Sequence, residues 1–563
     1  MKKYSILLTL FICYNLLGQN NQVIDPFNYS ISKNDTFSKG SVASAHPLAS
    51  LYGVKMMQEG GNAFDAAITS QLVLAVVYPA AGNIGGGGFM VAKTGNKFLA
   101  LDYREKAPSK AFEQMYWDEN GNPILEKSQK SALASGVPGT IAGIFETVQF
   151  TKLPFKQLIQ PAIDVAENGF AITEREANSL NKLAVEFKKY NHHITAFQQK
   201  NNWQKGDTLI QKELANTLKR IRDFGLKGFY EGETADYIVK EMKKGNGIIS
   251  KEDLKNYKAV WRKPLITNYK GYEIVGMPPP SSGGIIVAQL LKMVEDKNLD
   301  SKIFGSTESV QLMIEAERRA YADRAEHMGD PDFVKVPVET LISNSYLKER
   351  MKDYDSTKAS LSKNINAGSI KESEETTHIS IIDKEGNMVA ITTTLNDSYG
   401  SKTVVAGAGF LLNNEMDDFS IKPGVPNMYG AVGGKANAIA PNKRMLSSMT
   451  PTLVLKNKKP FLVVGTPGGT TIPTSVFQSI VNIIDFNLSA FDAVNLPKFH
   501  HQWLPDEVFF EKDFNKKTIS ELAKMGYTIK YREAIGRVEL LKINNNFIEA
   551  VADKRGDDSV AGY

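Results

Sequence analysis

The sequence predicts an α/β fold, because segments with helical spacing of apolar residues alternate with short runs of strand-forming residues. Two such runs, residues 377–382 and 388–395, flank a short turn-forming segment and predict a β-hairpin. Helices are predicted at residues 47–59 and 63–77, and the second is apolar enough to be buried. The region 135–355 is predicted to be mainly helical, and the chain shows no internal repeat.

Composition narrows the class of protein. The chain of 563 residues could hold several domains or one large globular unit. Hydrophobic residues make up 42% and charged residues 23%, both ordinary values for a globular protein. The formal net charge of +5 is small for this length, and no long run of Lys or Arg concentrates it. Nucleic acid is therefore not expected as a partner.

Residues 1–18 are predicted to be a secretory signal peptide. Lys2 and Lys3 supply a positive start, Tyr4 to Leu17 an apolar core, and Gly18 a small residue at the end. A membrane anchor is the alternative, but the core is shorter than the roughly 20 residues that a spanning helix needs. No later stretch is apolar enough to span a membrane. We therefore expect export, into the periplasm, without a stable membrane anchor.

The positions of cysteine and histidine in the sequence argue against disulfides, a thiol nucleophile and a metal site. Cys13, the only cysteine, lies inside the predicted signal peptide, so the mature chain would have neither disulfides nor a thiol nucleophile. The adjacent His500 and His501 could suggest a metal site, but no further ligand clusters with them. We interpret the two histidines as structural, and we expect no metal or organic cofactor.

Three further segments have simple structural interpretations. The glycine-rich segment 82–88 lacks the Lys-Ser/Thr of a phosphate-binding loop and predicts a tight turn with close backbone packing. Residues 278–284, rich in Pro, Ser and Gly, predict a rigid loop to which we assign no chemistry. Residues 315–324 form a predicted helix with several charge pairs at spacings of three and four, which indicates a solvated face.

The predicted hairpin places two hydroxyls opposite each other. If its turn is symmetric about Glu385, Thr376 lies across from Thr394, close enough for a hydrogen bond. Such a pair is usually only a sheet contact. However, the polar and acidic segment 371–375 runs directly into the strand. A cut after Glu375 would give Thr376 a free amine, with a pKa of about 7.7–8.0, beside its own hydroxyl. One residue would then supply both base and nucleophile.

Several polar residues elsewhere allow more than one interpretation. Arg104 follows a predicted strand and could belong to a solvated charge cluster or bind a carboxylate. Glu415 and Asp418 lie one helical turn apart; they could be a glycosidase-type acid and base, hold an ammonium group, or form a solvated turn. Ser447 and Ser448 could simply form a turn. The segment 465–469 lies between a predicted strand and helix, where backbone N–H groups suit an oxyanion.

Four motifs in this order resemble the gamma-glutamyltransferases, which are self-cleaving N-terminal-nucleophile hydrolases. The motifs are residues 376–387, 394–396, 413–419 and 444–449. The resemblance extends from about Ser41 to Tyr563, and several independent motifs in one order make chance similarity very improbable.

The resemblance implies a four-layer αββα sandwich, formed as one globular unit by two self-cleaved chains. The larger chain would be residues 19–375 and the smaller, catalytic chain residues 376–563, associated as a heterodimer. The implied reaction takes a gamma-glutamyl group from glutathione or a related compound and passes it to water, an amino acid or a peptide amine.

The resemblance also implies a role for each candidate residue. Thr376 is the nucleophile and Thr394 orients it, while Gly468 and Gly469 form the oxyanion hole. The α-carboxylate of the substrate is held by Arg104, Ser447 and Ser448. Its α-amino group is held by Asn396, Glu415 and Asp418. The loop 423–434, which contains Tyr429, resembles a lid over the site.

Two rival functions remain open at this point. An acylase of the same superfamily acting on a β-lactam side chain would also cleave itself. The set Arg104, Asn396, Asp418, Ser447 and Ser448 instead favours a substrate with a free α-amino acid head. A non-catalytic periplasmic binding protein is the second rival, and its chain would stay intact.

Overall fold

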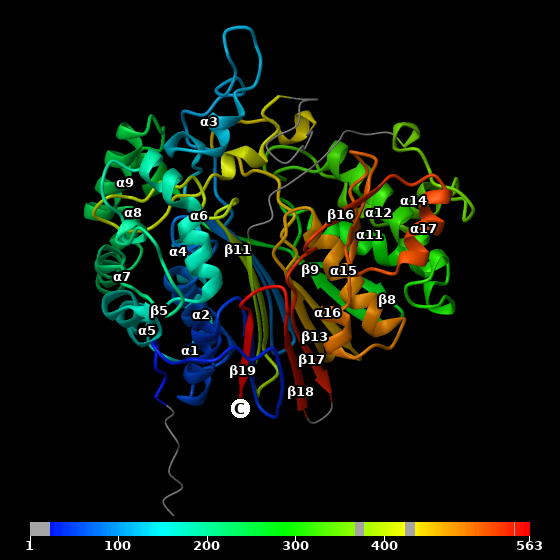
Figure 1. The fold of residues 1–563 in the computed structure, drawn as a ribbon, viewed down its shortest axis with the longest axis horizontal. Coiled ribbons are helices and arrows are strands. Elements are labelled where there is room, and N and C mark those ends of the chain that lie inside the picture. Colours follow the sequence, from blue (N-terminus) through cyan, green and yellow to red (C-terminus); the bar gives the residue numbers. More distant parts are fainter. Residues whose placement is uncertain (1–22, 366–375, 423–433, 545–546) are drawn as a thin grey trace, which may run out of the picture.

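The computed structural model describes residues 23–365, 376–422, 434–544 and 547–563, and its centre is a pair of seven-stranded sheets (Figure 1). The strands of the first sheet lie in the order β1 (Asn34–Phe37), β18 (Phe547–Ala552), β17 (Glu539–Asn544), β13 (Lys459–Gly465), β12 (Thr452–Lys456), β9 (Tyr272–Gly276) and β8 (Leu265–Tyr269). Those of the second lie in the order β19 (Ser559–Gly562), β2 (Ser41–Ser44), β10 (Thr377–Ile382), β11 (Met388–Thr394), β3 (Gly87–Thr94), β4 (Lys97–Asp102) and β7 (Val260–Arg262).

The two sheets pack against each other through an apolar layer. Val91 and Ala390 from the second sheet and Leu453 and Val463 from the first are fully buried in it. Neighbouring strands within both sheets run antiparallel, so consecutive strands can be joined by short turns. Strands β7, β8 and β9 interrupt the region that the sequence predicted to be mainly helical.

The hairpin of β10 and β11 has the register that the sequence predicted. Ile382 pairs with Met388 and Thr377 with Thr393, which extends toward Thr376 and Thr394 at the open end. The turn is closed by Asp383, whose carboxylate accepts a hydrogen bond from the backbone N–H of Asn387 at 3.0 Å. Both strands are buried throughout, because one sheet face meets the first sheet and the other meets helices.

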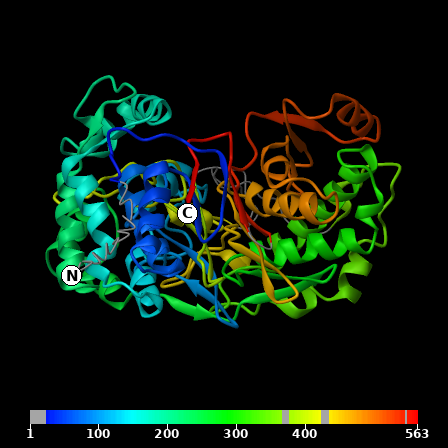
Figure 2. The ribbon, with the colours of Figure 1, turned by 90° about the horizontal axis from the view of Figure 1, so that it is seen from below.

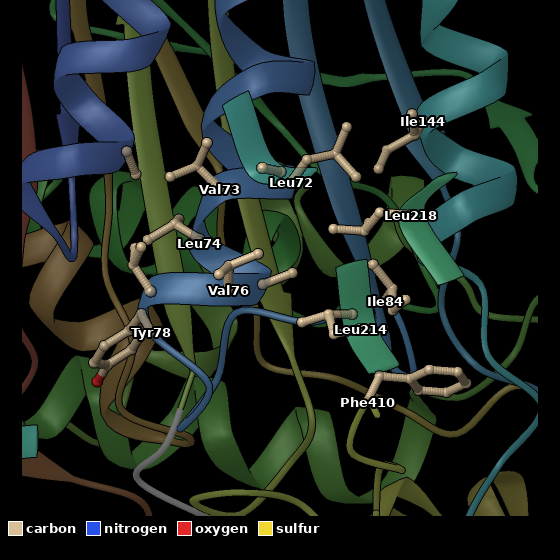
Figure 3. Packing of buried hydrophobic residues seen from close by; sticks show 14 of the residues in the cluster. Leu72, Val73, Leu74, Val76, Tyr78, Ile84, Ile144, Leu214, Leu218 and Phe410 are labelled. Carbon is tan, nitrogen blue, oxygen red and sulfur yellow. The ribbon is translucent and has the colours of Figure 1, made fainter. Parts of the chain in front are cut away.

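One helical layer covers the outer face of the second sheet (Figure 1). It contains α1 (Pro47–Gln58), α2 (Ala63–Val77), α4 (Thr140–Thr147), α5 (Phe155–Asn168), α6 (Glu174–Tyr190), α7 (Lys212–Phe224), α8 (Lys227–Tyr230) and α9 (Gly232–Lys244). All of α2 is buried, as predicted, and its Leu72 and Val76 lie among Leu214, Leu218 and Ile144 of the surrounding helices (Figure 3). This packing supports the sheet directly behind the hairpin.

A second helical layer covers the first sheet, which completes the predicted αββα sandwich (Figure 2). It contains α11 (Gly283–Glu295), α12 (Thr307–His327), α14 (Asn344–Arg350), α15 (Thr471–Ile484), α16 (Ala490–Asn495) and α17 (Lys516–Lys524). The smaller elements are α3 (Leu125–Gln129), α10 (Lys251–Asn256), α13 (Val338–Leu341), β5 (Phe170–Ala171), β6 (Thr208–Leu209), β14 (Phe499–His501), β15 (Val508–Glu511) and β16 (Ile529–Arg532). Within the described ranges, no helix is both long and apolar enough to cross a membrane.

The prediction of a solvated face for residues 315–324 is wrong. Helix α12 lies inside the second helical layer, and the charged residues of 315–324 are buried, several of them in ion pairs. Glu315 lies 2.6 Å from Arg319 and 3.4 Å from Arg318, and it accepts a hydrogen bond from the Tyr527 hydroxyl at 2.6 Å. Charge pairs at helical spacing look the same in sequence whether the face is exposed or covered.

Glu315 is expected to contribute to stability in a pH-dependent way. Burial alone would raise the pKa of its carboxyl group, but Arg318 and Arg319 outweigh burial and lower the pKa to about 2. A lowered pKa in the folded state means that this stability is present above the unfolded pKa of about 4.3 and is lost as pH falls toward 2.

We expect Glu315→Gln to lower the free energy of unfolding at pH 7 by about 3–5 kcal/mol, because it leaves buried guanidinium groups without their carboxylate. Thermal unfolding followed by circular dichroism measures the effect, and the loss should shrink near pH 3. The matched control is Glu308→Gln on the same helix, since the Glu308 side chain is 77% exposed. Equal melting temperatures for the two variants would contradict the prediction.

Candidate active site

A small cavity of about 20 Å³ lies at the open end of the β10–β11 hairpin. All but two of the predicted site residues line it, together with Met449 and Ile472: Arg104, Thr376, Thr394, Asn396, Glu415, Asp418, Ser447, Ser448 and Gly469. Gly468 is next to the cavity lining in sequence, and Tyr429 lies outside the described residues. Residues that are far apart in the chain therefore surround one small space.

Thr376 and Thr394 are positioned by the β10–β11 hairpin and by the glycine-rich turn that packs against it. Both side chains are almost fully buried. The Thr394 hydroxyl accepts a hydrogen bond from the backbone N–H of Asn396 at 2.7 Å, and its carbonyl accepts one from Asn83 at 2.9 Å. A Cβ atom on Gly86 would lie 2.1 Å from the Thr394 carbonyl oxygen, so this close approach requires glycine. The turn predicted for residues 82–88 is confirmed.

Arg104 is buried, so its interpretation as part of a solvated cluster is wrong. Its backbone N–H donates to Asp102 at 3.0 Å, and the Tyr257 hydroxyl donates to its carbonyl at 2.7 Å. The guanidinium lies 2.6 Å from Glu415 and also pairs with Asp418. Burial alone would lower the pKa of Arg104, but these carboxylates outweigh burial and raise it. The cavity thus holds opposite charges side by side.

Glu415 and Asp418 lie on a single turn of 3-10 helix, η6 (Glu415–Asp418). Glu415 is fully buried and its N–H donates to the Asn413 side chain at 3.1 Å. The Asp418 carbonyl accepts from Asn437 at 2.7 Å. These contacts aim both carboxylates at Arg104, so the interpretation as a solvated turn is wrong.

Glu105 adds a third carboxylate that the sequence did not single out. It is fully buried, and one of its oxygens lies 3.5 Å from Arg104. Burial raises the pKa of its carboxyl group to about 7, although Arg104 opposes this rise. Glu105 is therefore only partly ionised at neutral pH. With Glu415 and Asp418, it keeps the surroundings of one guanidinium net negative, which suits a cationic group on a ligand.

The two serines Ser447 and Ser448 are held by a segment to which the sequence assigned no chemistry. The Ser282 hydroxyl donates to the Ser447 carbonyl at 2.8 Å, and the Ser281 hydroxyl donates to the Met449 carbonyl at 2.7 Å. Arg324 of α12 donates to the Ser448 hydroxyl at 3.0 Å. Residues 281, 282 and 324 precede the serines by more than a hundred positions, and no local spacing signals the contact.

Gly468 and Gly469 form the turn between β13 and α15. Their φ angles are +134° and +57°, a region that favours glycine. A Cβ atom on Gly468 would lie 2.4 Å from the Thr471 hydroxyl, which leaves no room for a side chain. Backbone N–H groups at such a turn, beside Gly469 on the cavity wall, suit a developing oxyanion.

The histidines have structural partners. His500 lies 2.9 Å from the Thr474 hydroxyl and 3.0 Å from the Gln502 side chain, and burial lowers its pKa to about 3. His378 of β10 lies 2.8 Å from the Thr392 hydroxyl, and burial lowers its pKa to about 3 as well. In the part of the chain that the structure describes, no three His, Cys, Asp or Glu residues are grouped as a metal site would need.

Solved structures identify the class of protein. A cephalosporin acylase from Bacillus halodurans aligns with a TM-score of 0.82 at 26% identity, covering 96% of this chain and 99% of that chain. A gamma-glutamyltranspeptidase from Helicobacter pylori aligns with a TM-score of 0.56 at 43% identity, covering 61% of this chain and 97% of that chain. The chain has the αββα fold of the N-terminal-nucleophile hydrolases, and it is an enzyme of that class.

The sequence relatives identify the family. A family model described as Gamma-glutamyltranspeptidase matches residues 49–563. The glutathione hydrolase proenzyme of Escherichia coli (strain K12) is 45% identical, covering 96% of this chain and 95% of that protein. The proenzyme of the same name from Pseudomonas aeruginosa is 42% identical, covering 92% and 94%. The chain therefore belongs to the gamma-glutamyltranspeptidase family, as its motifs predicted.

Proposed function

We propose that Thr376 is the nucleophile through which this gamma-glutamyltransferase and glutathione hydrolase acts, after the chain has cleaved itself between Glu375 and Thr376. The observation that carries the proposal is the convergence of Thr376, Thr394, Gly469 and Arg104 on one cavity. A nucleophile, a neighbouring hydroxyl, backbone donors and a cation are the parts that acyl transfer from an amino acid derivative requires.

The proposed reaction uses the new N-terminus as its base. The Thr376 amine takes the proton of the Thr376 hydroxyl as the oxygen attacks the γ-amide carbon of glutathione or a related compound. The N–H groups of Gly468 and Gly469 stabilise the oxyanion. Collapse breaks the amide bond, and the amine returns the proton to the leaving nitrogen of cysteinylglycine. Water then hydrolyses the glutamyl ester, or an amino acid or peptide amine accepts the glutamyl group.

The charged part of the cavity would hold the α-amino acid head of the substrate. Arg104 is paired with Glu415 and Asp418. A zwitterionic head carries the same two charges, so its carboxylate can take the place beside Arg104 while its ammonium takes the place beside the acids. Each buried charge keeps an opposite partner, which avoids the cost of an unpaired ion. Ser447 and Ser448 would add donors to the carboxylate, and Asn396 an acceptor for the ammonium.

The two proposed chains, residues 19–375 and 376–563, would remain associated after cleavage. Each sheet contains strands from both: β2 pairs with β10 and β19, and β12 pairs with β9. Separating them would break hydrogen bonds and expose the apolar layers. The solved Helicobacter pylori chain is matched over 97% of its own length and covers 61% of this chain. Residues 19–375 make up a similar fraction of this chain, which supports the proposed division.

Export and the lid are further parts of the proposal. Residues 1–18 would be removed as a signal peptide and the mature enzyme would reside in the periplasm. Tyr429 would belong to a loop that covers the bound substrate. Both segments lie outside the described residues, so these parts depend on sequence alone.

The proposal is tested by intact mass spectrometry and by release of p-nitroaniline from γ-glutamyl-p-nitroanilide, with and without glycylglycine as acceptor. We expect two masses that divide before Thr376, and turnover that glycylglycine accelerates. A β-lactam side-chain acylase would also give two masses, but it would not turn over this substrate. A single mass with no turnover would exclude the proposed function.

A further inference from the structure

Arg324 is a buried guanidinium behind the wall of the cavity that the proposed reaction does not use. It lies near the end of α12, whose charged residues the sequence placed in solvent. Its Nη2 donates to the Ser448 hydroxyl at 3.0 Å, and its Nε donates to the Ser282 hydroxyl at 2.8 Å. Ser282 in turn donates to the Ser447 carbonyl at 2.8 Å. One side chain therefore reaches both serines of the pair.

We propose that Arg324 is a positioning residue that directs the Ser448 hydroxyl toward the carboxylate of the substrate and so sets the enzyme's preference for an α-carboxylate. A hydroxyl has one donor hydrogen and two acceptor lone pairs. The bond from Arg324 engages the acceptor side of Ser448, which leaves its O–H to donate. No acceptor for that O–H is found in the described part of the chain, and Ser448 lines the cavity. The O–H is thus kept for an incoming anion.

The geometry also explains why an arginine suits this position. The planar guanidinium offers several N–H donors in fixed directions, so it can hold Ser448 and Ser282 at once. A lysine would carry the same charge but would place it on one flexible atom. The charge of Arg324 polarises the Ser448 O–H and strengthens its bond to a carboxylate. Arg104 would touch the carboxylate itself, whereas Arg324 acts through Ser448.

The inference rests on the proposed function, because the carboxylate to which Ser448 would donate is the α-carboxylate of the glutamyl group. The test uses the full-length, processed enzyme with γ-glutamyl-p-nitroanilide and with 4-aminobutyryl-p-nitroanilide, which lacks only the α-carboxylate. We expect Arg324→Gln to raise KM for the first substrate about tenfold, within the coupling range of neighbouring groups, with kcat little changed. For the second substrate, KM should stay the same.

Two further variants separate positioning from a structural role. In a Ser448→Ala background, Arg324→Gln should change KM by less than about twofold, because the hydroxyl it acts on is gone. Arg324→Lys should recover part of the affinity. If Arg324→Gln fails to fold, KM for the two substrates is compared in Arg324→Lys instead. The matched control is Arg319→Gln, a buried arginine of the same helix that pairs with Glu315; it should lower the melting temperature and leave KM unchanged.

Some outcomes would overturn the inference. Unchanged KM in a folded, cleaved Arg324→Gln enzyme would do so, and so would an equal rise for both substrates or an undiminished effect in the Ser448→Ala background. Failure of the proposed function looks different, because the unmodified enzyme itself would then release no p-nitroaniline from the glutamyl substrate.

Discussion

Replacing Thr376 by alanine is expected to leave one uncleaved chain that releases no p-nitroaniline from γ-glutamyl-p-nitroanilide. In the proposed first step, the Thr376 hydroxyl attacks the carbonyl carbon of Glu375. The peptide C–N bond breaks as an ester forms, the Thr376 amine is freed, and water hydrolyses the ester. The same hydroxyl later attacks the substrate. One substitution therefore removes both activities, and turnover should fall on the order of 10⁴-fold or more, as for the loss of other nucleophiles.

Three neighbouring variants sharpen this test. Thr376→Ser keeps a hydroxyl and should retain part of both activities. Thr394→Ala removes an orienting hydrogen bond worth about 1 kcal/mol, so cleavage and turnover should slow only about fivefold. Thr377→Ala is the matched control, because Thr377 is also buried and its hydroxyl has no hydrogen-bond partner in the described structure. Two fragments split before position 376 in the Thr376→Ala variant, with normal turnover, would falsify the proposal.

Local sequence patterns predicted the hairpin because its register depends on adjacent residues. Two runs of strand-forming residues, 377–382 and 388–395, with a turn taken as symmetric about Glu385, were enough to predict that Thr376 lies across from Thr394, and the observed pairing of Thr377 with Thr393 agrees with that register. The apolar helix at 63–77 was equally evident, since a segment without a polar face has to be covered on all sides. The four layers followed from the family resemblance rather than from these patterns.

Long-range burial was not accessible from the sequence. The charge pairs of α12 were placed in solvent because local spacing cannot reveal that other chain segments cover the helix. For the same reason Arg324, Ser281 and Ser282 were missed, although they hold Ser447 and Ser448. Glu105 was also missed, because a carboxylate beside an arginine in sequence usually indicates a surface pair. Its burial against Arg104 becomes visible only in three dimensions.

Arg104→Gln and Asp418→Asn are expected to lower kcat/KM for γ-glutamyl-p-nitroanilide by on the order of 10³-fold each, because each removes the partner of a desolvated charge, a loss of about 3–5 kcal/mol. Both variants should still cleave before Thr376, since neither residue belongs to the proposed cleavage step. A processed, folded variant with unchanged kinetics would count against its assigned role.

Substrate analogues that lack one of the two charges show which residue binds the α-carboxylate and which binds the α-amino group. The 4-aminobutyryl analogue lacks the α-carboxylate, so the Arg104→Gln penalty should largely disappear with it, while the Asp418→Asn penalty should persist. The glutaryl analogue lacks the α-amino group, and there the pattern should reverse. In the structure Arg104 is paired with Glu415 and Asp418. Arg104→Gln therefore leaves these carboxylates without their cation, where they repel a substrate carboxylate, and Asp418→Asn removes part of the negative charge that attracts a substrate ammonium. A substrate that lacks the affected group escapes that part of the loss, so a crossed pattern, rather than a uniform loss, is the result that assigns the two ends of the substrate.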